Sequence, residues 1–159
     1  MHIMKNNNRY ILYLLLLGSL LTAACRGAEP GDIYNCDGVK SVIVAVDANG
    51  NPSMVMSLDE AINIDADSAL SWSLHVGNGW HLPSKAEMEI VRKNRSLINR
   101  GLELKKLSVV LRNNTYYWTS TPCSDSHVYA CGPDGLKCYF RSNASHCYRA
   151  RTVKVLEQQ

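Results

Sequence analysis

The alternation of hydrophobic and polar positions predicts a β-hairpin at the start of the folded region. Residues 39–46 form a β-branched run, Val-Lys-Ser-Val-Ile-Val-Ala-Val, and a second apolar run extends from Ser53 to Leu58. Asp-Ala-Asn-Gly-Asn lies between them, and two apolar runs around an Asn-Gly turn are typical of a hairpin. Residues 59–73 have early acidic residues and scattered apolar positions, which predicts a weak helix.

A capping signal marks the clearest predicted helix. Ser84 follows Pro83, and Glu87 stands three positions later, so the hydroxyl and the carboxylate can each bond a free amide at the helix start. Met88 and Val91 supply its apolar face. We expect this helix to end near residue 94 and a second, short helix to cover 97–106.

The C-terminal half of the chain is predicted to be rich in strands and loops. Strand-like runs cover residues 109–111, 116–121, 136–141 and 148–156. A hairpin, then helices, then further strands within 159 residues indicate a single α+β domain.

The first 24 residues have the pattern of a secretory signal peptide. Lys5 and Arg9 precede an apolar run over 10–21, which is too short to span a bilayer, and small residues lead into Cys25. The sequence Leu-Thr-Ala-Ala-Cys resembles a bacterial lipobox, which implies that Cys25 is lipidated and becomes the mature N-terminus. The alternative is ordinary signal-peptidase cleavage after Ala24.

This leader predicts an exported protein of the cell envelope, and the lipobox implies an outer-membrane lipoprotein. We expect residues 25–32 to be the lipidated cysteine and a short flexible tether, and residues 33–159 to be the folded domain. The membrane would then be contacted through the lipid anchor.

The charge argues against a nucleic-acid partner. The chain has 17 Lys and Arg against 14 Asp and Glu, and removal of residues 1–24 leaves 15 against 14. A mature protein this close to neutral has no excess of positive charge that would indicate a nucleic-acid partner.

The six cysteines do not have the spacing of a metal site. Cys123, Cys131, Cys138 and Cys147 fall eight, seven and nine positions apart, which is too far for the closely paired cysteines of a zinc site. We therefore expect no metal and no cofactor. The adjacent His146 and Cys147 would point to opposite faces of a strand, which argues against a catalytic pair. Export permits disulfides, and one bridge within 123–147 is plausible.

Three segments in order resemble the bacterial DUF1566 and fibrobacter-paralogous-domain families. They are Gly-Trp-His-Leu-Pro-Ser-Lys-Ala-Glu-Met from Gly79, Tyr-Trp-Thr-Ser-Thr from Tyr117 and Tyr-Arg-Ala-Arg-Thr-Val from Tyr148. The earlier Val-Met-Ser-Leu-Asp-Glu-Ala from Val55 is also similar to a segment of that group. The resemblance covers about residues 31–156.

This resemblance implies a C-type-lectin-like fold, related to formylglycine-generating enzyme and to the variable proteins of diversity-generating retroelements. Trp80, Leu82 and Trp118 are expected to anchor the core. The chain departs from the family at Pro122, where Glu is frequent, and at Val128, where Ala is common. It is much shorter than formylglycine-generating enzyme and lacks a recognisable pair of that enzyme's catalytic cysteines, so an enzyme of this kind is the less favoured hypothesis.

Residues 119–153 have an unusual composition. Among these residues only Lys137 belongs to the set Lys, Glu, Gln, Met and Trp, the amino acids that codons ending in a pyrimidine cannot encode. Adenine-directed mutagenesis by a diversity-generating retroelement produces this exclusion. The alternative is an ordinary polar, turn-rich region of a family member.

Both alternatives place function on the same surface, over residues 123–148. Tyrosines there supply contact area, and small polar side chains supply adaptable hydrogen bonds. The alternative is that about half of these side chains face inward, because strand residues alternate, and we expect Tyr148 and Phe140 to be buried. The predicted ligand-binding residues are Ser124, Asp125, Ser126, His127, Tyr129, Asp134, Tyr139, Arg141, Asn143, Ser145 and His146. The sequence thus predicts a non-enzymatic, membrane-anchored domain that binds a protein or glycan ligand. The alternative is a structural pilus or envelope assembly subunit with one fixed partner.

Overall fold

The computed structural model describes residues 26–143 and 145–157. The predicted signal peptide over 1–24 and the predicted lipidation at Cys25 lie outside these residues. Among the helices of the described part, none is long and apolar enough to cross a membrane.

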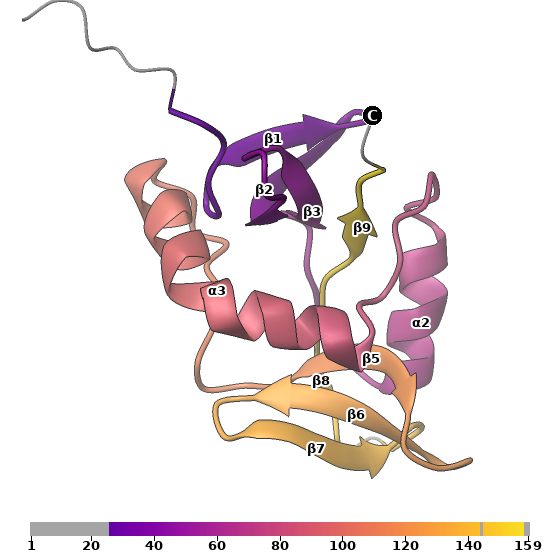
Figure 1. Cartoon of the computed structure of the whole chain (residues 1–159). Coiled ribbons are helices and arrows are strands. Elements are labelled where there is room, and N and C mark those ends of the chain that lie inside the picture. Colours follow the sequence, from indigo (N-terminus) through magenta and orange to yellow (C-terminus); the bar gives the residue numbers. More distant parts are fainter. Residues whose placement is uncertain (1–25, 144, 158–159) are drawn as a thin grey trace, which may run out of the picture.

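The predicted hairpin is confirmed and forms the centre of the first sheet. Strands β2 (Val39–Val46) and β3 (Pro52–Ser57) pair antiparallel around the Asn-Gly turn. Strand β1 (Ile33–Cys36) pairs with β2, and β9 (Val153–Val155) pairs with β3, so the order is β1-β2-β3-β9. The sheet therefore joins the start of the folded chain to its end (Figure 1).

The second sheet gathers the strands of the C-terminal half. Its order is β4 (Ala61–Ile64), β8 (Tyr148–Ala150), β5 (Tyr117–Pro122), β6 (His127–Gly132) and β7 (Gly135–Phe140). Only the β5–β8 pairing is parallel among these neighbours. The strands predicted over 116–121 and 136–141 are confirmed. The one predicted over 148–156 is divided between the two sheets, and residues 109–111 form no strand.

Helix α3 (Lys85–Leu104) begins as predicted, since the Ser84 hydroxyl accepts from the Glu87 amide and the Glu87 carboxylate accepts from the Ser84 amide. The helix continues through Asn94 instead of ending there, so the prediction of two short helices is wrong. Ile98 and Leu102 extend the apolar stripe of Met88 and Val91 into the core, and the Asn94 side chain donates to the Val44 carbonyl at 2.9 Å.

Helix α2 (Ala66–Leu74) corresponds to only the second half of the weak helix predicted over 59–73. Asp65 caps it, because its carboxylate accepts from the Ser68 amide at 2.8 Å. The first half of the predicted helix is instead strand β4, which is held by pairing with β8.

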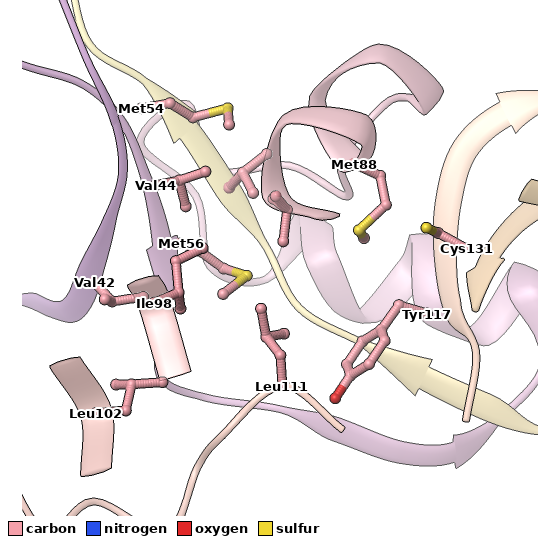
Figure 2. Packing of buried hydrophobic residues seen from close by; sticks show 12 residues of the cluster. Val42, Val44, Met54, Met56, Met88, Ile98, Leu102, Leu111, Tyr117 and Cys131 are labelled. Atoms are coloured by element: carbon pink, nitrogen blue, oxygen red, sulfur yellow. The ribbon is translucent and has the colours of Figure 1, made fainter. Parts of the chain in front are cut away.

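The core is arranged in layers with α3 between the two sheets (Figure 1). Figure 2 shows β2 and β3 side chains such as Val44 and Met56 facing Ile98 of α3, with Tyr117 and Cys131 of the second sheet across from them. Trp118 and Leu82 pack in a separate cluster with α2, and Trp80 packs with Ile43 and Val55 of the first sheet. The expected core roles of the two tryptophans and of Leu82 are confirmed.

Two chain segments pass from one sheet to the other next to each other. One leads from β3 to β4 and the other from β8 to β9, and the Ser57 amide donates to the Thr152 carbonyl at 3.0 Å where they meet. Glu60 on the first segment accepts from Arg149, from the Nε of Arg151 at 3.2 Å and from the Tyr117 hydroxyl at 3.0 Å. The crossing thus places a paired carboxylate beside a guanidinium that is 1% exposed.

The end of the predicted tether is not free of the domain. The Gly31 amide donates to the Ile43 carbonyl at 2.9 Å, and the Ile43 amide donates to the Asp32 carbonyl at 2.9 Å. Gly31 also lies so close to α3 that a Cβ on Gly101 would be 2.0 Å from its carbonyl oxygen. These backbone contacts bind residues 31–32 to the body, which differs from the flexible tether expected from composition.

Candidate ligand-binding surface

The predicted binding residues lie on one edge of the second sheet. They occupy the β5–β6 turn, strands β6 and β7 and the loop over 141–147, and β7 is the edge strand (Figure 1). None of the eleven is buried: Ser124, Asp125, Ser126, Asp134 and Ser145 are exposed, and His127, Tyr129, Tyr139, Arg141, Asn143 and His146 are half-buried.

A disulfide between Cys123 and Cys138 braces this edge. It joins the end of β5 to the middle of β7, with the two Cα atoms 6.4 Å apart. The expectation of one bridge within 123–147 is therefore confirmed. Cys36 and Cys131 are buried thiols, and burial raises the pKa of both.

Strand pairing divides the predicted surface into two faces. His127 lies opposite Phe140 and Tyr129 opposite Cys138, whereas Val128 lies opposite Tyr139 and Ala130 opposite Lys137. Because paired residues share a face and successive residues alternate, His127 and Tyr129 are on one face and Tyr139 on the other. The register thus assigns the predicted residues of β6 and β7 to opposite faces, as the alternation of strand residues implies.

The first face, which we call the His127 face, consists of Ser124, Ser126, His127, Tyr129 and Phe140. The His127 and Phe140 rings are 4.0 Å apart between centroids, and both serine hydroxyls bond to His127 Nδ1, at 3.1 and 2.8 Å. The Lys85 ammonium lies 4.4 Å above the Tyr129 ring. This face therefore offers an aromatic pair beside hydroxyl groups.

The second face carries a set of rings in edge-to-face and tilted contact, which we call the tyrosine cluster: Tyr116, Tyr139, His146 and Tyr148. Ring centroids of Tyr139 lie 5.2 Å from Tyr116, 5.0 Å from Tyr148 and 5.1 Å from His146. Gly132 lets the Tyr116 ring lie on β6, because a Cβ there would meet the ring at 2.3 Å.

Hydrogen bonds and burial raise the pKa of two phenols in this cluster. The Tyr116 hydroxyl donates to Asp134 at 2.6 Å, and this bond, with one to Tyr139, raises the pKa of Tyr116. Burial and a hydrogen bond with Tyr139 raise the pKa of Tyr148. The Lys137 ammonium pairs with Asp134 and, with Tyr116, lowers the pKa of that carboxyl.

One ring nitrogen in the cluster has no hydrogen-bond partner within the described chain. Nδ1 of His146 is buried, although the residue as a whole is half-buried beside Tyr139 and Tyr148. A buried polar nitrogen normally has a partner. This nitrogen is the clearest unmet hydrogen-bonding group on the predicted surface.

The loop over 141–147 is tied to helix α2. The Arg141 guanidinium donates to Asp67 at 3.0 Å, and the Ser142 hydroxyl donates to the same carboxylate. These bonds, that of Ser142 foremost, lower the pKa of Asp67. Asn143 closes a local turn, since its side-chain oxygen accepts from the Ser145 amide at 2.8 Å. Arg141 and Asn143 thus position the loop and leave less of their polar atoms for a ligand.

Two surface residues differ from the sequence interpretation. Phe140 was expected to be buried and is 49% exposed, because it lies near the end of the edge strand, against only His127. Tyr116 was not among the predicted binding residues, yet it joins the tyrosine cluster from the start of β5. The sequence signal that could have pointed to Tyr116 is its position directly before the buried run Tyr-Trp-Thr.

Other chemistry on the described chain is sparse around this surface. Cys123 and Cys138 are bonded to each other, so neither offers a thiolate to His127. No group of three or more His, Cys, Asp and Glu is arranged to hold a metal ion within the described residues. A hollow of about 990 Å³ lies elsewhere, between the β1–β2 and β2–β3 turns, and its Asp37 and Lys154 pair at 2.6 Å.

Comparison with known proteins leaves the chain without an assigned family. No family model matches the sequence, and no curated protein matches it.

Proposed function

We propose that this protein is an exported lipoprotein, anchored at Cys25 in the cell envelope, whose domain binds a protein or glycan ligand without catalysing a reaction. The observation that carries the proposal is the edge of the second sheet, where the His127 face and the tyrosine cluster lie on strands braced by Cys123–Cys138. Rigid strands that present tyrosines, an imidazole and small hydroxyls have the composition of a recognition surface.

The disulfide also supports export. Disulfides persist in oxidising compartments such as the bacterial periplasm and are rare in the cytosol. Cys123–Cys138 therefore fits the signal peptide and lipobox of residues 1–25.

We further propose that the fold is C-type-lectin-like, as the three motifs imply. The α+β arrangement of two sheets around α3 is compatible with that assignment. The motif residues Trp80, Leu82, Trp118 and Arg151 are buried, so they account for stability and leave the 123–148 edge for recognition.

A pair of matched truncations tests the binding surface. The mature chain would be screened on a glycan array and against a displayed-peptide library. Every selected ligand would be titrated against three variants, Phe140→Ala, His146→Ala and the control Ile62→Ala. Phe140→Ala removes an exposed ring on β7, and Ile62→Ala removes an exposed side chain, 57% accessible, on β4 at the opposite edge of the same sheet. Central aromatic truncations cost binding by tenfold or more.

We expect Phe140→Ala, or His146→Ala in the tyrosine cluster, to weaken the selected ligands about tenfold while Ile62→Ala leaves them unchanged. Equal affinity for all three variants would refute the proposed surface. Selection of one ligand in fixed stoichiometry, from every strain sampled, would instead support an assembly subunit with a fixed partner.

A further inference from the structure

The outward side of α3 carries a stripe that combines exposed aliphatic and basic side chains. Ile90, Leu97 and Leu104 recur every seven residues and are 38%, 48% and 73% exposed. Lys93 and Arg100 fall between them with the same spacing and are also exposed. Residues three, four and seven apart share one side of a helix, so these five form the α3 stripe.

The positive charge of the domain is concentrated at this helix. Residues 85–106 contain seven Lys and Arg against three Asp and Glu, although the mature chain as a whole is near neutral. Lys93, Arg100, Lys105 and Lys106 form no ion pair with any carboxylate of the described chain. Exposed aliphatic residues among solvated cations are typical of helices that lie on anionic membrane surfaces.

The described chain begins close to this stripe. Arg26, which follows the predicted anchor directly in the sequence, pairs with Glu29 and Asp32. Only five residues later, Gly31 packs against α3 at Gly101, and its amide is bonded to Ile43 (Figure 1). A lipid on Cys25 would therefore hold the domain close to the bilayer, within reach of the C-terminal half of α3.

We propose that the α3 stripe is the surface that this lipoprotein lays against an anionic phospholipid bilayer, next to its own anchor. The inference rests on the lipid anchor of the proposed function. Exposed Leu97 and Leu104 would enter the interfacial region, and Lys93, Arg100, Lys105 and Lys106 would lie at the anionic headgroups. A second copy of the chain fits less well, because a self-complementary contact would bring these unpaired cations together.

Lysine accessibility tests the inference on the full-length, acylated protein. The protein would be reconstituted into phosphatidylcholine vesicles, with or without phosphatidylglycerol, and treated with a membrane-impermeant amine-acylating reagent. Mass spectrometry would report labelling at Lys93 of the stripe and at Lys105 and Lys106 directly after Leu104, which we call together the stripe lysines. Exposed Lys40 on β2 is the internal control. The attraction of one Lys or Arg to an anionic surface corresponds to about a fivefold increase in the ratio of bound to free side chain.

We expect labelling of the three stripe lysines to fall about fivefold in phosphatidylglycerol vesicles, to recover at high salt, and to stay high in phosphatidylcholine. Lys40 should be labelled equally throughout. In the variant Lys93→Glu/Arg100→Glu/Lys105→Glu, Lys106 should lose its protection, whereas Lys40→Glu should preserve it.

Three failures are distinguishable. Acylated protein whose stripe lysines are labelled equally in both vesicle types would overturn the inference alone. Protein that incorporates no fatty acid at Cys25 would overturn the anchor of the proposed function and this inference with it. Protection that appears in detergent and grows with protein concentration would overturn the bilayer in favour of self-association.

Discussion

Glu60 shows how single residues decide whether the two sheets stay joined. Its carboxylate accepts hydrogen bonds from Arg149, Arg151 and the Tyr117 hydroxyl. Arg149 belongs to β8, Arg151 to the segment between β8 and β9, and Tyr117 to β5. Arg151 is 1% exposed and also donates to the Val109 carbonyl. A buried guanidinium is tolerated only while its counter-charge remains, so the loss of Glu60 would cost more free energy than its own hydrogen bonds contribute.

Removing that counter-charge should destabilise the fold strongly. We expect Glu60→Gln to lower the free energy of unfolding by about 3–5 kcal/mol, because Arg151 would remain buried without a carboxylate. Urea denaturation followed by tryptophan fluorescence measures the change. Glu103→Gln is the matched control, since Glu103 is exposed without an ion pair in the described chain, and it should change stability by less than about 0.5 kcal/mol. Equal losses for both variants would contradict this role of Glu60.

His81 and Glu87 form a pair whose contribution should depend on pH. Nε2 of His81 lies 2.9 Å from the Glu87 carboxylate, and Nδ1 lies 3.0 Å from the Gly79 carbonyl. Burial alone would lower the pKa of His81, but the two hydrogen bonds outweigh it and the pKa is raised from 6.5. Burial alone would raise the pKa of Glu87, but hydrogen bonds from Ser84 and His81 outweigh it, so this pKa is lowered from 4.5.

The signs of these shifts fix the pH window. The raised pKa of His81 stabilises the fold below pH 6.5, and this is lost as the pH rises through the folded-state pKa. The lowered pKa of Glu87 stabilises the fold above pH 4.5 and is lost on further acidification. A double-mutant cycle with His81→Gln and Glu87→Gln should therefore show a coupling free energy between the two side chains from about pH 4.5 to pH 6.5. This coupling should disappear in alkaline solution. Coupling that is constant across the range would refute the pair.

At the scale of elements, α3 is the structure on which both sheets are assembled. Its buried stripe fills the space between them, and its first turn is fixed by reciprocal bonds between Ser84 and Glu87. The Lys85 amide also donates to the Thr121 hydroxyl at 2.8 Å, which connects the helix start to β5. A defect at this end should therefore reach both the helix and the second sheet.

Loss of the cap should cost a measurable part of the stability. We expect Ser84→Ala to destabilise the protein by about 1 kcal/mol, because the Glu87 amide loses its acceptor. Ser96→Ala deletes the same hydroxyl from an exposed position within α3 and should be neutral or slightly stabilising. Chemical denaturation of both variants provides the comparison, and indistinguishable midpoints would show that the box contributes nothing.

The Cys123–Cys138 disulfide is the second element-scale device, since it holds the β5–β6 turn to the edge strand. It closes a loop with a sequence separation of 15, for which chain-entropy estimates give about 3 kcal/mol. Reductant should therefore lower the unfolding midpoint of the natural chain. The Cys123→Ser/Cys138→Ser variant should start at the lower midpoint and be insensitive to reductant. A natural chain that ignores reductant would contradict the bridge's contribution.

At the scale of the whole molecule, the fold separates positions that tolerate change from positions that do not. Residues 119–153 include buried Val128, Ala130 and Arg151 as well as the exposed turn over 124–126. Diversity in this block, whatever its origin, is compatible with the fold only at the accessible positions.

A library comparison tests that separation. Randomising Ser124, Asp125 and Ser126 should leave most clones resistant to proteolysis, because the three side chains are exposed. Randomising Val128, Ala130 and Arg151 to the same depth should leave few, since each is at most 5% exposed. Equal survival of the two libraries would show that the block is not divided in this way. A near-repeat of the encoding DNA that differs only at adenines, beside a reverse transcriptase gene, would establish diversification.

Local signals in the sequence predicted the elements whose stability is local. The hairpin followed from its Asn-Gly turn, the start of α3 from Ser84 and Glu87, and β5 and β7 from their β-prone runs. The composition of 123–148 predicted a surface, and none of the eleven residues chosen from it is buried. These features depend on neighbours within a few positions, so one sequence was enough.

Tertiary contacts decided the rest. The run over 148–156 changes sheets because Ala150 pairs with β4 while Val153 pairs with β3, and no local pattern marks that division. Helix α3 continues past Asn94 because Ile98 and Leu102 are buried in the core against the first sheet, where the Asn94 side chain also bonds the Val44 carbonyl. The binding residues fall on two faces because β6 and β7 pair in one particular register. Sequence determined which segments are apolar and how they turn, whereas long-range pairing and packing determined which of their sides meet.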